Sequence, residues 1–270
     1  MTAKKQLLLF LLICLPISWA LMGGANLLGK GEIMTTPAAY MVYGIACFMP
    51  MITAIVVCRL SHNSIRSLNL FPKLQGNGKL YAFAIISAVL ISIWDTPLVT
   101  VLFAPSAASI KEEMPVAMIV FTILLYTAIG CLQFFILMGE EVGWMGLLFP
   151  KLEEISGTTV AIVITGLVRG CWHIPMILQQ DNILDSFLML CATNIAGGCL
   201  LVLLTKKSGS VVPAAVCHAI TNTLPLIFQQ SVVINEAAYK SCEVLVNGIV
   251  YVPYLVFMGV CWFLLVRGRK

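Results

Sequence analysis

The run LLLFLLICLPISWALMGGANLL at residues 7–28 carries no charged side chain. At a rise of 1.5 Å per residue, a helix over this run is long enough to cross the ~30 Å hydrocarbon core of a bilayer. Lys4 and Lys5 precede the run, as in a secretory signal peptide, but no cleavage motif of small residues follows it closely. We therefore expect the run to form a transmembrane helix.

The rest of the chain has the same apolar character. Of its 270 residues, 60% are apolar and only 10% are charged, and its mean hydropathy is +0.99, whereas soluble domains carry roughly 25% charged residues. This composition excludes an ordinary soluble domain and a disordered chain, and it argues against a nucleic-acid partner. Most of the cysteines lie in apolar runs without metal-ligand spacing, so we expect them to be small buried hydrophobic residues.

Further apolar runs of similar length follow the first one. The sequence thus predicts an all-α fold, a polytopic membrane bundle of about eight transmembrane helices. The expected spans are 6–28, 38–58, 80–104, 116–149, 158–180, 184–204, 210–230 and 245–266. We divide them into an N-terminal group of three helices at 1–115, a core of four at 116–230 and a last helix at 231–270.

The basic residues give an independent test of this arrangement. If both termini are cytoplasmic, twelve of the sixteen basic residues lie on the inner side, and only Lys30, Lys111 and Lys240 lie on the outer side. Lys and Arg accumulate in cytoplasmic segments of membrane proteins. The imbalance therefore predicts a multi-pass integral membrane protein, surrounded by the lipid bilayer, with both termini in the cytoplasm.

The sixteenth basic residue, Arg169, falls inside a predicted span, as do Asp95, Glu140 and Glu141. A charge at the centre of a membrane helix costs about 2.5–3.5 kcal/mol, so such residues usually face one another or a water-filled cavity. For Asp95, in WDTP at 94–97, a polar group at a helix kink is a simpler interpretation than a contact with substrate.

The other charged residues of the predicted spans, together with two histidines, fall in three short segments. These are GEEVGWMG at 139–146, RGCWHIP at 169–175 and HAITN at 218–222. Counted from the cytoplasmic helix ends, Glu140, His218 and His173 lie about 15, 14 and 24 Å deep. We therefore expect them to meet in one cavity that opens to the cytoplasm.

Helical periodicity refines this picture. Residues four apart share one face of a helix, which pairs Arg169 with His173 and His218 with Asn222. Glu140 and Glu141 are adjacent and point about 100° apart, so only one of them can aim directly at a common centre. The two carboxylates are therefore expected to have different roles.

Such a set of side chains favours the activation of water. A carboxylate in a dry surround is a competent general base, and a neighbouring histidine can relay the proton. Amide and imidazole N–H groups can stabilise a developing oxyanion, so hydrolysis of a peptide bond is the expected reaction. Glu140, His173 and His218 are also a workable ligand set for a divalent metal such as zinc.

A transporter that uses the buried charges as an ion path is a second interpretation, but the chain lacks paired half-helix breaks.

The three segments resemble the CAAX protease and bacteriocin-processing (CPBP) family of intramembrane endopeptidases, which includes the type II CAAX prenyl endopeptidases. Members of that family carry E-E-x-x-x-R, then F-x-x-x-H, then H-x-x-x-N/D. The matching strings are GEEVGWMGLLFP at 139–150, GLVRGCWHIP at 166–175 and HAITN at 218–222. The first three spans resemble the family only in being hydrophobic.

The resemblance implies a role for each residue. Glu140 would activate water, His173 would be its partner, His218 with Asn222 would stabilise the oxyanion, and Glu141 would be a supporting carboxylate. The substrate would be a membrane-associated peptide or lipidated protein, such as a CAAX-type tail, a pheromone or a bacteriocin leader. The family leaves the participation of a metal open.

Two positions depart from the family pattern. Met145 replaces the arginine of the first motif, and Arg169 replaces the aromatic residue of the second. We hypothesise that Arg169 supplies Glu141 with the cation that Met145 no longer provides. The alternative is a catalytically inactive homologue that acts as a membrane scaffold or bacteriocin-immunity protein.

Overall fold

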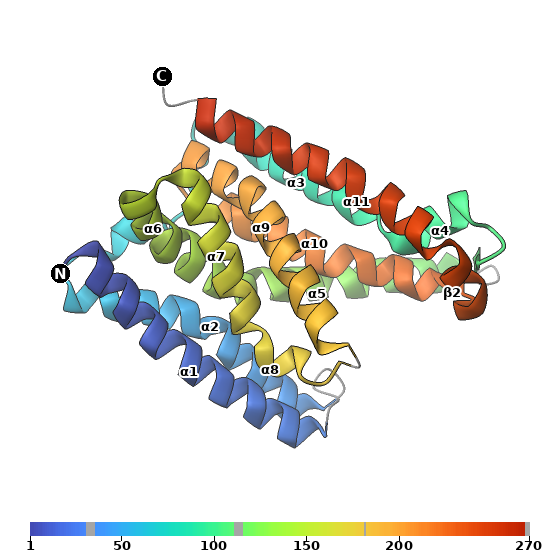
Figure 1. Cartoon of the computed structure of the whole chain (residues 1–270), viewed down its shortest axis with the longest axis horizontal. Helices are drawn as coiled ribbons and strands as arrows, with labels where there is room; N and C mark the ends of the chain where they lie inside the picture. The colour runs from blue at the N-terminus through green and yellow to red at the C-terminus, as the bar shows by residue number, and fades with distance from the viewer. Residues whose placement is uncertain (31–35, 111–115, 181, 268–270) are drawn as a thin grey trace.

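The computed structural model describes residues 1–30, 36–110, 116–180 and 182–267, and most of them are helical (Figure 1). The helices in chain order are α1 (Ala3–Gly29), α2 (Pro37–Leu60), the 3-10 helix η1 (Ile65–Leu68), α3 (Gly78–Ile93), α4 (Thr96–Phe103), α5 (Val116–Gly143), the π-helix η2 (Trp144–Leu148), α6 (Phe149–Ser156), α7 (Thr158–Trp172), α8 (Ile174–Ile177), α9 (Ile183–Ser208), α10 (Val212–Ser231) and α11 (Glu236–Arg267). Each predicted span overlaps one of these helices or a succession of them.

The helices form a membrane bundle, as predicted. Five of them are long and apolar enough to cross a bilayer: α1, α2, the continuous stretch Leu124–Ser156, α9 and α11. The bent pair α3 and α4 is a sixth if the two count as one span. Helix α7 is apolar but shorter, so the predicted number of eight crossings is not confirmed.

The predicted span 80–104 is bent in its middle. Helices α3 and α4 meet at an angle of 53°, and the break falls at Trp94 and Asp95. The Asp95 carboxylate accepts a hydrogen bond of 2.8 Å from the backbone N–H of Thr96, and thereby caps the first turn of α4. The interpretation of Asp95 as a polar group at a kink is therefore confirmed.

Two boundaries near the charged segments differ from the prediction. The fourth span does not end before Pro150, because α5 continues through η2 into α6 and ends only at Gly157. Pro150 lies in the first turn of α6, where proline is tolerated. Conversely, the predicted span 158–180 breaks at His173, because Pro175 has no N–H to donate to the carbonyl of Cys171 four residues earlier.

Glycines on α5 and α7 let neighbouring helices approach closely. A methyl group on Gly143 would lie 2.6 Å from the carbonyl carbon of Pro50 in α2, and one on Gly166 would lie 2.7 Å from the Cα of Ile195 in α9. Small residues at such crossings allow backbone contact between membrane helices. The contacts fix α5 against α2 and α7 against α9.

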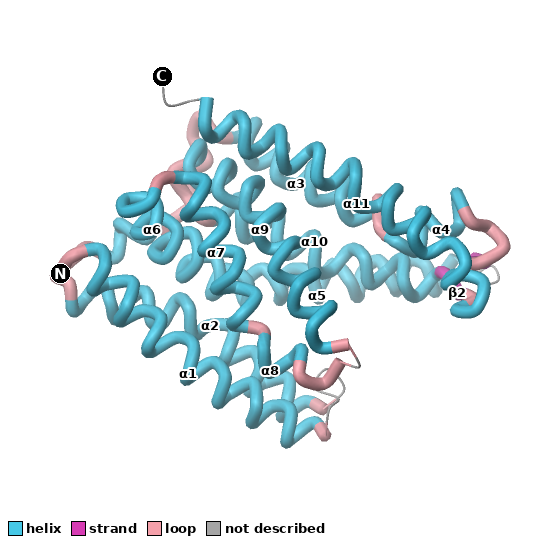
Figure 2. Tube along the Cα trace, viewed as in Figure 1, coloured by secondary structure: helices cyan, strands magenta, loops and turns pink. Residues whose placement is uncertain are grey.

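A short antiparallel sheet lies at the end of the bundle where α10 meets α11. Strand β1 (Ala108–Ile110) pairs with β2 (Val232–Ile234), with Ser109 opposite Val233. The sequence did not predict this pair, because strands of three residues leave no readable alternation of polar and apolar residues. The loops gather at the ends of the helices (Figure 2).

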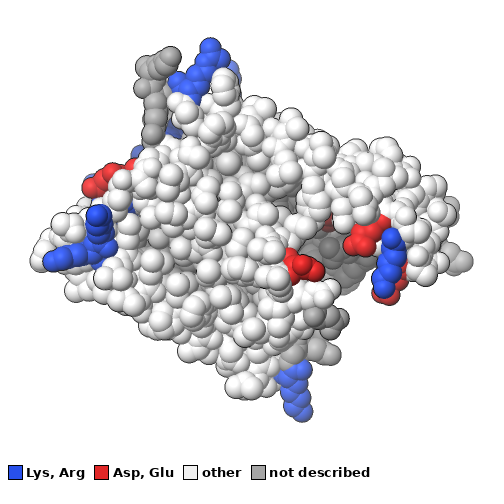
Figure 3. Space-filling model, viewed as in Figure 1, with Lys and Arg blue, Asp and Glu red and all other residues white. Residues whose placement is uncertain are grey.

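The surface shown in Figure 3 has charged side chains toward opposite ends of the helices and a broad uncharged band between them. Helix α1 begins and α11 ends on the same side of the bundle, at the left of Figure 1. Both features fit an integral membrane protein. Lys111, Arg269 and Lys270, which the charge argument uses, and the predicted domain boundary at residue 115 lie outside the described residues.

Candidate active site

Three helices carry the predicted site residues. Glu140 and Glu141 lie in the last turn of α5, Arg169 lies in α7 with His173 just beyond its end, and His218 and Asn222 lie in α10. Helix α10 packs against α3, α5 and α9, and α7 packs against α9. The three segments therefore converge from different parts of the chain on the centre of the bundle.

Helix α1 fixes the segment that contains His173. The indole N–H of Trp19 donates a hydrogen bond of 3.1 Å to the carbonyl of Cys171, and the side-chain amide of Asn26 donates one of 2.8 Å to the carbonyl of Pro175. Both carbonyls lie at the break between α7 and α8. The contacts hold His173 in place although no continuous helix runs through it.

Glu141 is the centre of a buried ionic cluster. Its Oε1 accepts a hydrogen bond of 3.0 Å from Nη1 of Arg169 and one of 2.8 Å from Nδ1 of His218. The side chains of Glu141 and Arg169 are 0% and 4% exposed. The ion pair hypothesised between Arg169 and Glu141 is therefore present, while Met145 is buried among hydrophobic residues.

The contact with Glu141 determines the tautomer of neutral His218. A carboxylate oxygen only accepts hydrogen bonds, so Nδ1 of His218 carries the proton at this distance of 2.8 Å. Nη2 of Arg169 lies 3.5 Å from the same nitrogen, and two donors do not form a hydrogen bond. Nε2 of the neutral ring is thus left as a proton acceptor.

His173 has the same tautomer for a different reason. Its Nδ1 lies 2.7 Å from the backbone carbonyl of Arg169, which also only accepts hydrogen bonds. The ring makes an edge contact with Trp172, with the ring centroids 4.7 Å apart. Nε2 of His173 is therefore also a proton acceptor in the neutral ring.

A cavity of about 270 Å³ brings four of the six predicted residues together. Arg169, His173, His218 and Asn222 line it. Tyr254 of α11 also lines this cavity. The sequence did not indicate Tyr254, which lies in a predicted span without any of the three motifs; its only signal was a hydroxyl group within a membrane helix.

The two adjacent carboxylates face different surroundings. Glu141 meets Arg169 and His218, whereas the polar groups beside Glu140 are Cys47 of α2 and the indole of Trp144. Neither carboxylate lines the cavity. The prediction that the two glutamates point in different directions is confirmed, and it is Glu141 that contacts His218.

One oxygen of Glu140 has no partner. Oε2 is buried without a hydrogen bond from any described residue, and the whole residue is only 3% exposed. Oε2 of Glu141 is also unpaired, but Oε1 of that residue is held by both Arg169 and His218. Buried polar atoms without a partner are rare in folded proteins, and a catalytic role is one of their recognised explanations.

The described residues do not support the predicted zinc ligands Glu140, His173 and His218. Among them, no three side chains of His, Cys, Asp or Glu lie close enough together to hold a metal ion. Glu140 and Glu141 point about 100° apart on α5, and it is Glu141 that contacts His218. We therefore derive no step through a metal.

Comparison with known families gives one match. Residues 117–224 match the model of the family described as type II CAAX prenyl endopeptidase Rce1-like. The matched segment contains the three motifs and all six predicted site residues. The family predicted from those motifs is thereby confirmed for this segment, and it supports a protease of the CAAX type. No curated protein matches the chain.

Proposed function

We propose that this integral membrane protein is an endopeptidase that hydrolyses a peptide bond inside the bundle. The proposal starts from the match of residues 117–224 to the type II CAAX prenyl endopeptidase Rce1-like family. The observation that carries the proposal is the cavity in which His173, His218 and Asn222 converge beside two buried glutamates. An intramembrane cavity lined by ionisable side chains needs a function to explain its cost.

Glu140 is proposed as the general base. The unpaired Oε2 accepts a proton from water as the water oxygen bonds to the carbonyl carbon of the substrate. Nε2 of His173 accepts the hydrogen bond of the second water hydrogen and orients the attack. Glu140 then transfers its proton to the amide nitrogen, the C–N bond breaks, and the products are a carboxylic acid and an amine.

His218 and Asn222 are proposed to stabilise the oxyanion. The Asn222 amide donates one hydrogen bond to it, and protonated Nε2 of His218 donates a second. The imidazolium form of His218 is stabilised by Glu141, whose carboxylate binds the opposite nitrogen of the ring. Arg169 holds Glu141 in this position. Glu141 and Arg169 are thus positioning residues.

The substrate is proposed to be a peptide or lipidated protein at the membrane, of the CAAX-tail, pheromone or bacteriocin-leader type. The start of α1 and the end of α11 lie on the same side of the bundle. Together with the predicted distribution of basic residues, this supports a cytoplasmic position for both termini. The cavity then opens to substrates delivered from the cytoplasmic side.

A cleavage assay tests the proposal. Purified protein in liposomes is incubated with fluorogenic peptides, both prenylated and unlipidated, and turnover is compared with that of Glu140→Ala, His173→Ala and Glu154→Gln. Glu154 is a matched control, since its carboxylate is exposed on α6 and pairs only with Lys151 among the described residues. We expect both site variants to lose about 10²-fold or more of the turnover and the control to keep it.

The result also decides the alternative of an inactive scaffold or immunity protein. That alternative is not favoured by the protease family match. It predicts no turnover of any peptide by the wild-type protein. Turnover that is equal in wild type, Glu140→Ala and His173→Ala would reject the assigned site.

A further inference from the structure

We infer that the cavity at the break between α3 and α4 is a specificity pocket that binds a basic side chain of the peptide substrate through Asp95. This inference rests on the proposed function, because it concerns the peptide that the active-site cavity would cleave. It assigns a role to the one intramembrane charge that the catalytic proposal does not use.

The break itself creates the pocket. The chain turns by 53° between α3 and α4, and the indole N–H of Trp94 donates a hydrogen bond of 2.9 Å to the carbonyl of Ile249 in α11. This bond fixes the corner against α11. The space between the bent helix pair, α9 and α11 is thereby held open.

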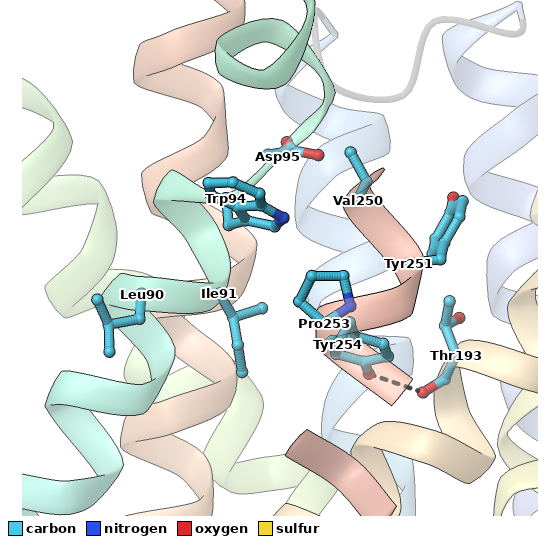
Figure 4. A pocket seen from close by; sticks show the side chains of 9 residues that line it. All are labelled: Leu90, Ile91, Trp94, Asp95, Thr193, Val250, Tyr251, Pro253 and Tyr254. Atoms are coloured by element: carbon cyan, nitrogen blue, oxygen red, sulfur yellow. Dashed lines mark hydrogen bonds between the residues drawn. The ribbon is translucent and has the colours of Figure 1, made fainter. Parts of the chain in front are cut away.

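The pocket has the size and lining of a ligand site. Its volume is about 460 Å³, within the range of roughly 300–1,000 Å³ that is common for ligand cavities. Apolar and aromatic side chains make up most of its wall, and Asp95 lies at one rim (Figure 4). The lining residues are Leu90, Ile91, Trp94, Asp95, Thr193, Val250, Tyr251, Pro253 and Tyr254.

The pocket adjoins the active-site cavity. Ile91, Thr193 and Tyr254 line both spaces, and the hydroxyl of Tyr254 donates a hydrogen bond of 3.3 Å to the carbonyl of Thr193 at this common wall (Figure 4). Asp95 lies four residues after Ile91, just beyond the end of α3 at Ile93. An extended peptide advances about 3.3 Å per residue. A side chain within a few residues of the scissile bond therefore enters this pocket.

Charge indicates what the pocket binds. Asp95 is the only charged residue in the lining, and in the described part of the chain it forms no ion pair. Its Oδ1 caps α4. A carboxylate at membrane depth is expected to have a partner, and the ammonium or guanidinium group of Lys or Arg fits this requirement.

The apolar walls fit the rest of such a side chain. Lys and Arg lay their methylene stems along apolar surfaces and keep the charged end in a polar environment. Trp94, Tyr251 and Pro253 offer such a surface beside Asp95. A phospholipid amine is less suitable, because its phosphate group would meet the same carboxylate.

The test uses a peptide that the wild-type protein cleaves. Each position within four residues of the cut is replaced in turn by Lys, by its uncharged analogue norleucine and by Glu, and kcat/KM is measured. We expect one position to prefer Lys over norleucine by about tenfold or more, and Glu there to be the poorest substrate. In Asp95→Asn this preference is expected to disappear while cleavage of the norleucine peptide is retained.

The variants separate charge from folding. Asn is as good as Asp at the start of a helix, so Asp95→Asn keeps the cap of α4, and Asp95→Ser gives a second uncharged cap. Asp185→Asn, at an exposed site in the first turn of α9, is the matched control and should retain the preference. A Lys preference that is absent in wild type, or equal in wild type and Asp95→Asn, overturns the inference. Absence of all peptide cleavage would instead overturn the proposed function.

Discussion

The two faces of α5 at Glu140 and Glu141 offer opposite environments to adjacent residues of the same type. On one face, Glu141 is fully buried and bonded to both Arg169 and His218. On the other face, Glu140 is almost as buried but forms no ion pair with any described residue, and it lies beside the thiol of Cys47 and the indole of Trp144. Burial is therefore the same on the two faces, while compensation of charge differs.

This difference separates structural from chemical roles. A buried carboxylate that is paired with an arginine stabilises the fold only as long as its partner is present, because the loss of either group leaves an uncompensated charge. A carboxylate without an ion-pair partner contributes no comparable pairing energy but remains free to take a proton. We therefore expect changes on the Glu141 face to act on stability and changes on the Glu140 face to act on turnover.

Replacing each glutamate by glutamine tests this separation most strongly. Glu140→Gln keeps the size of the side chain and removes the proposed base, so kcat is expected to fall by about 10²–10⁴-fold with little change in the unfolding temperature. Glu141→Gln is expected to lower the unfolding temperature clearly. Peptide turnover and thermal unfolding in detergent are measured on both variants. The separation is wrong if Glu140→Gln lowers stability more than Glu141→Gln does.

The partner of Glu141 provides the next test. Arg169→Met leaves the carboxylate buried and uncompensated, and the free energy of unfolding is expected to fall by about 3–5 kcal/mol. The double variant Met145→Arg, Arg169→Phe restores the family pattern and should recover part of this loss, because a cation again lies one turn from Glu141. Unfolding curves of the two variants and the wild type give the comparison. Equal stability of Arg169→Met and wild type would show that the ion pair has no structural role.

The sequence predicted much of this cluster. The exchange of Met145 and Arg169 between two motifs pointed to their common partner, and the helical spacing of His218 and Asn222 placed both at one cavity. Pro97, two residues after Asp95, indicated the kink. These features depend on local periodicity and on residue chemistry, which the sequence contains.

Other features depend on how the helices are rotated against each other. Which glutamate contacts His218 follows from the packing of Gly143 on Pro50 and of Gly166 on Ile195, and no periodicity within one helix determines it. The continuation of α5 through a π-helix and the break at His173 also depend on contacts with α1 and α2. The cavity beside Asp95 needs four helices, so its lining could not be derived from any single segment.

The cavity side of the site allows a smaller effect to be measured. Asn222 lines the cavity without contacting either glutamate through any hydrogen bond in the described residues, so its proposed role is confined to the oxyanion. Asn222→Ala is expected to reduce kcat by about 10²–10³-fold and to leave KM and the unfolding temperature near the wild-type values. An increase in KM without a change in kcat would instead assign Asn222 to substrate binding.

The smallest expected effect concerns the position of the Glu140 face against α2. A methyl group on Gly143 would lie 2.3 Å from Cβ of Pro50 and 2.7 Å from its carbonyl oxygen, whereas one on Gly24 in α1 has no atom within 4 Å. Gly143→Ala is therefore expected to cost about 1–3 kcal/mol of stability through overpacking, and Gly24→Ala to cost nothing. Since the clash is with α2, which carries Cys47 beside Glu140, turnover should fall further than stability alone explains. Thermal unfolding and kcat are measured for both variants. A Gly143→Ala protein with full kcat would mean that Glu140 needs no precise contact with α2. The contrast between the two faces of α5 would then lie in charge alone.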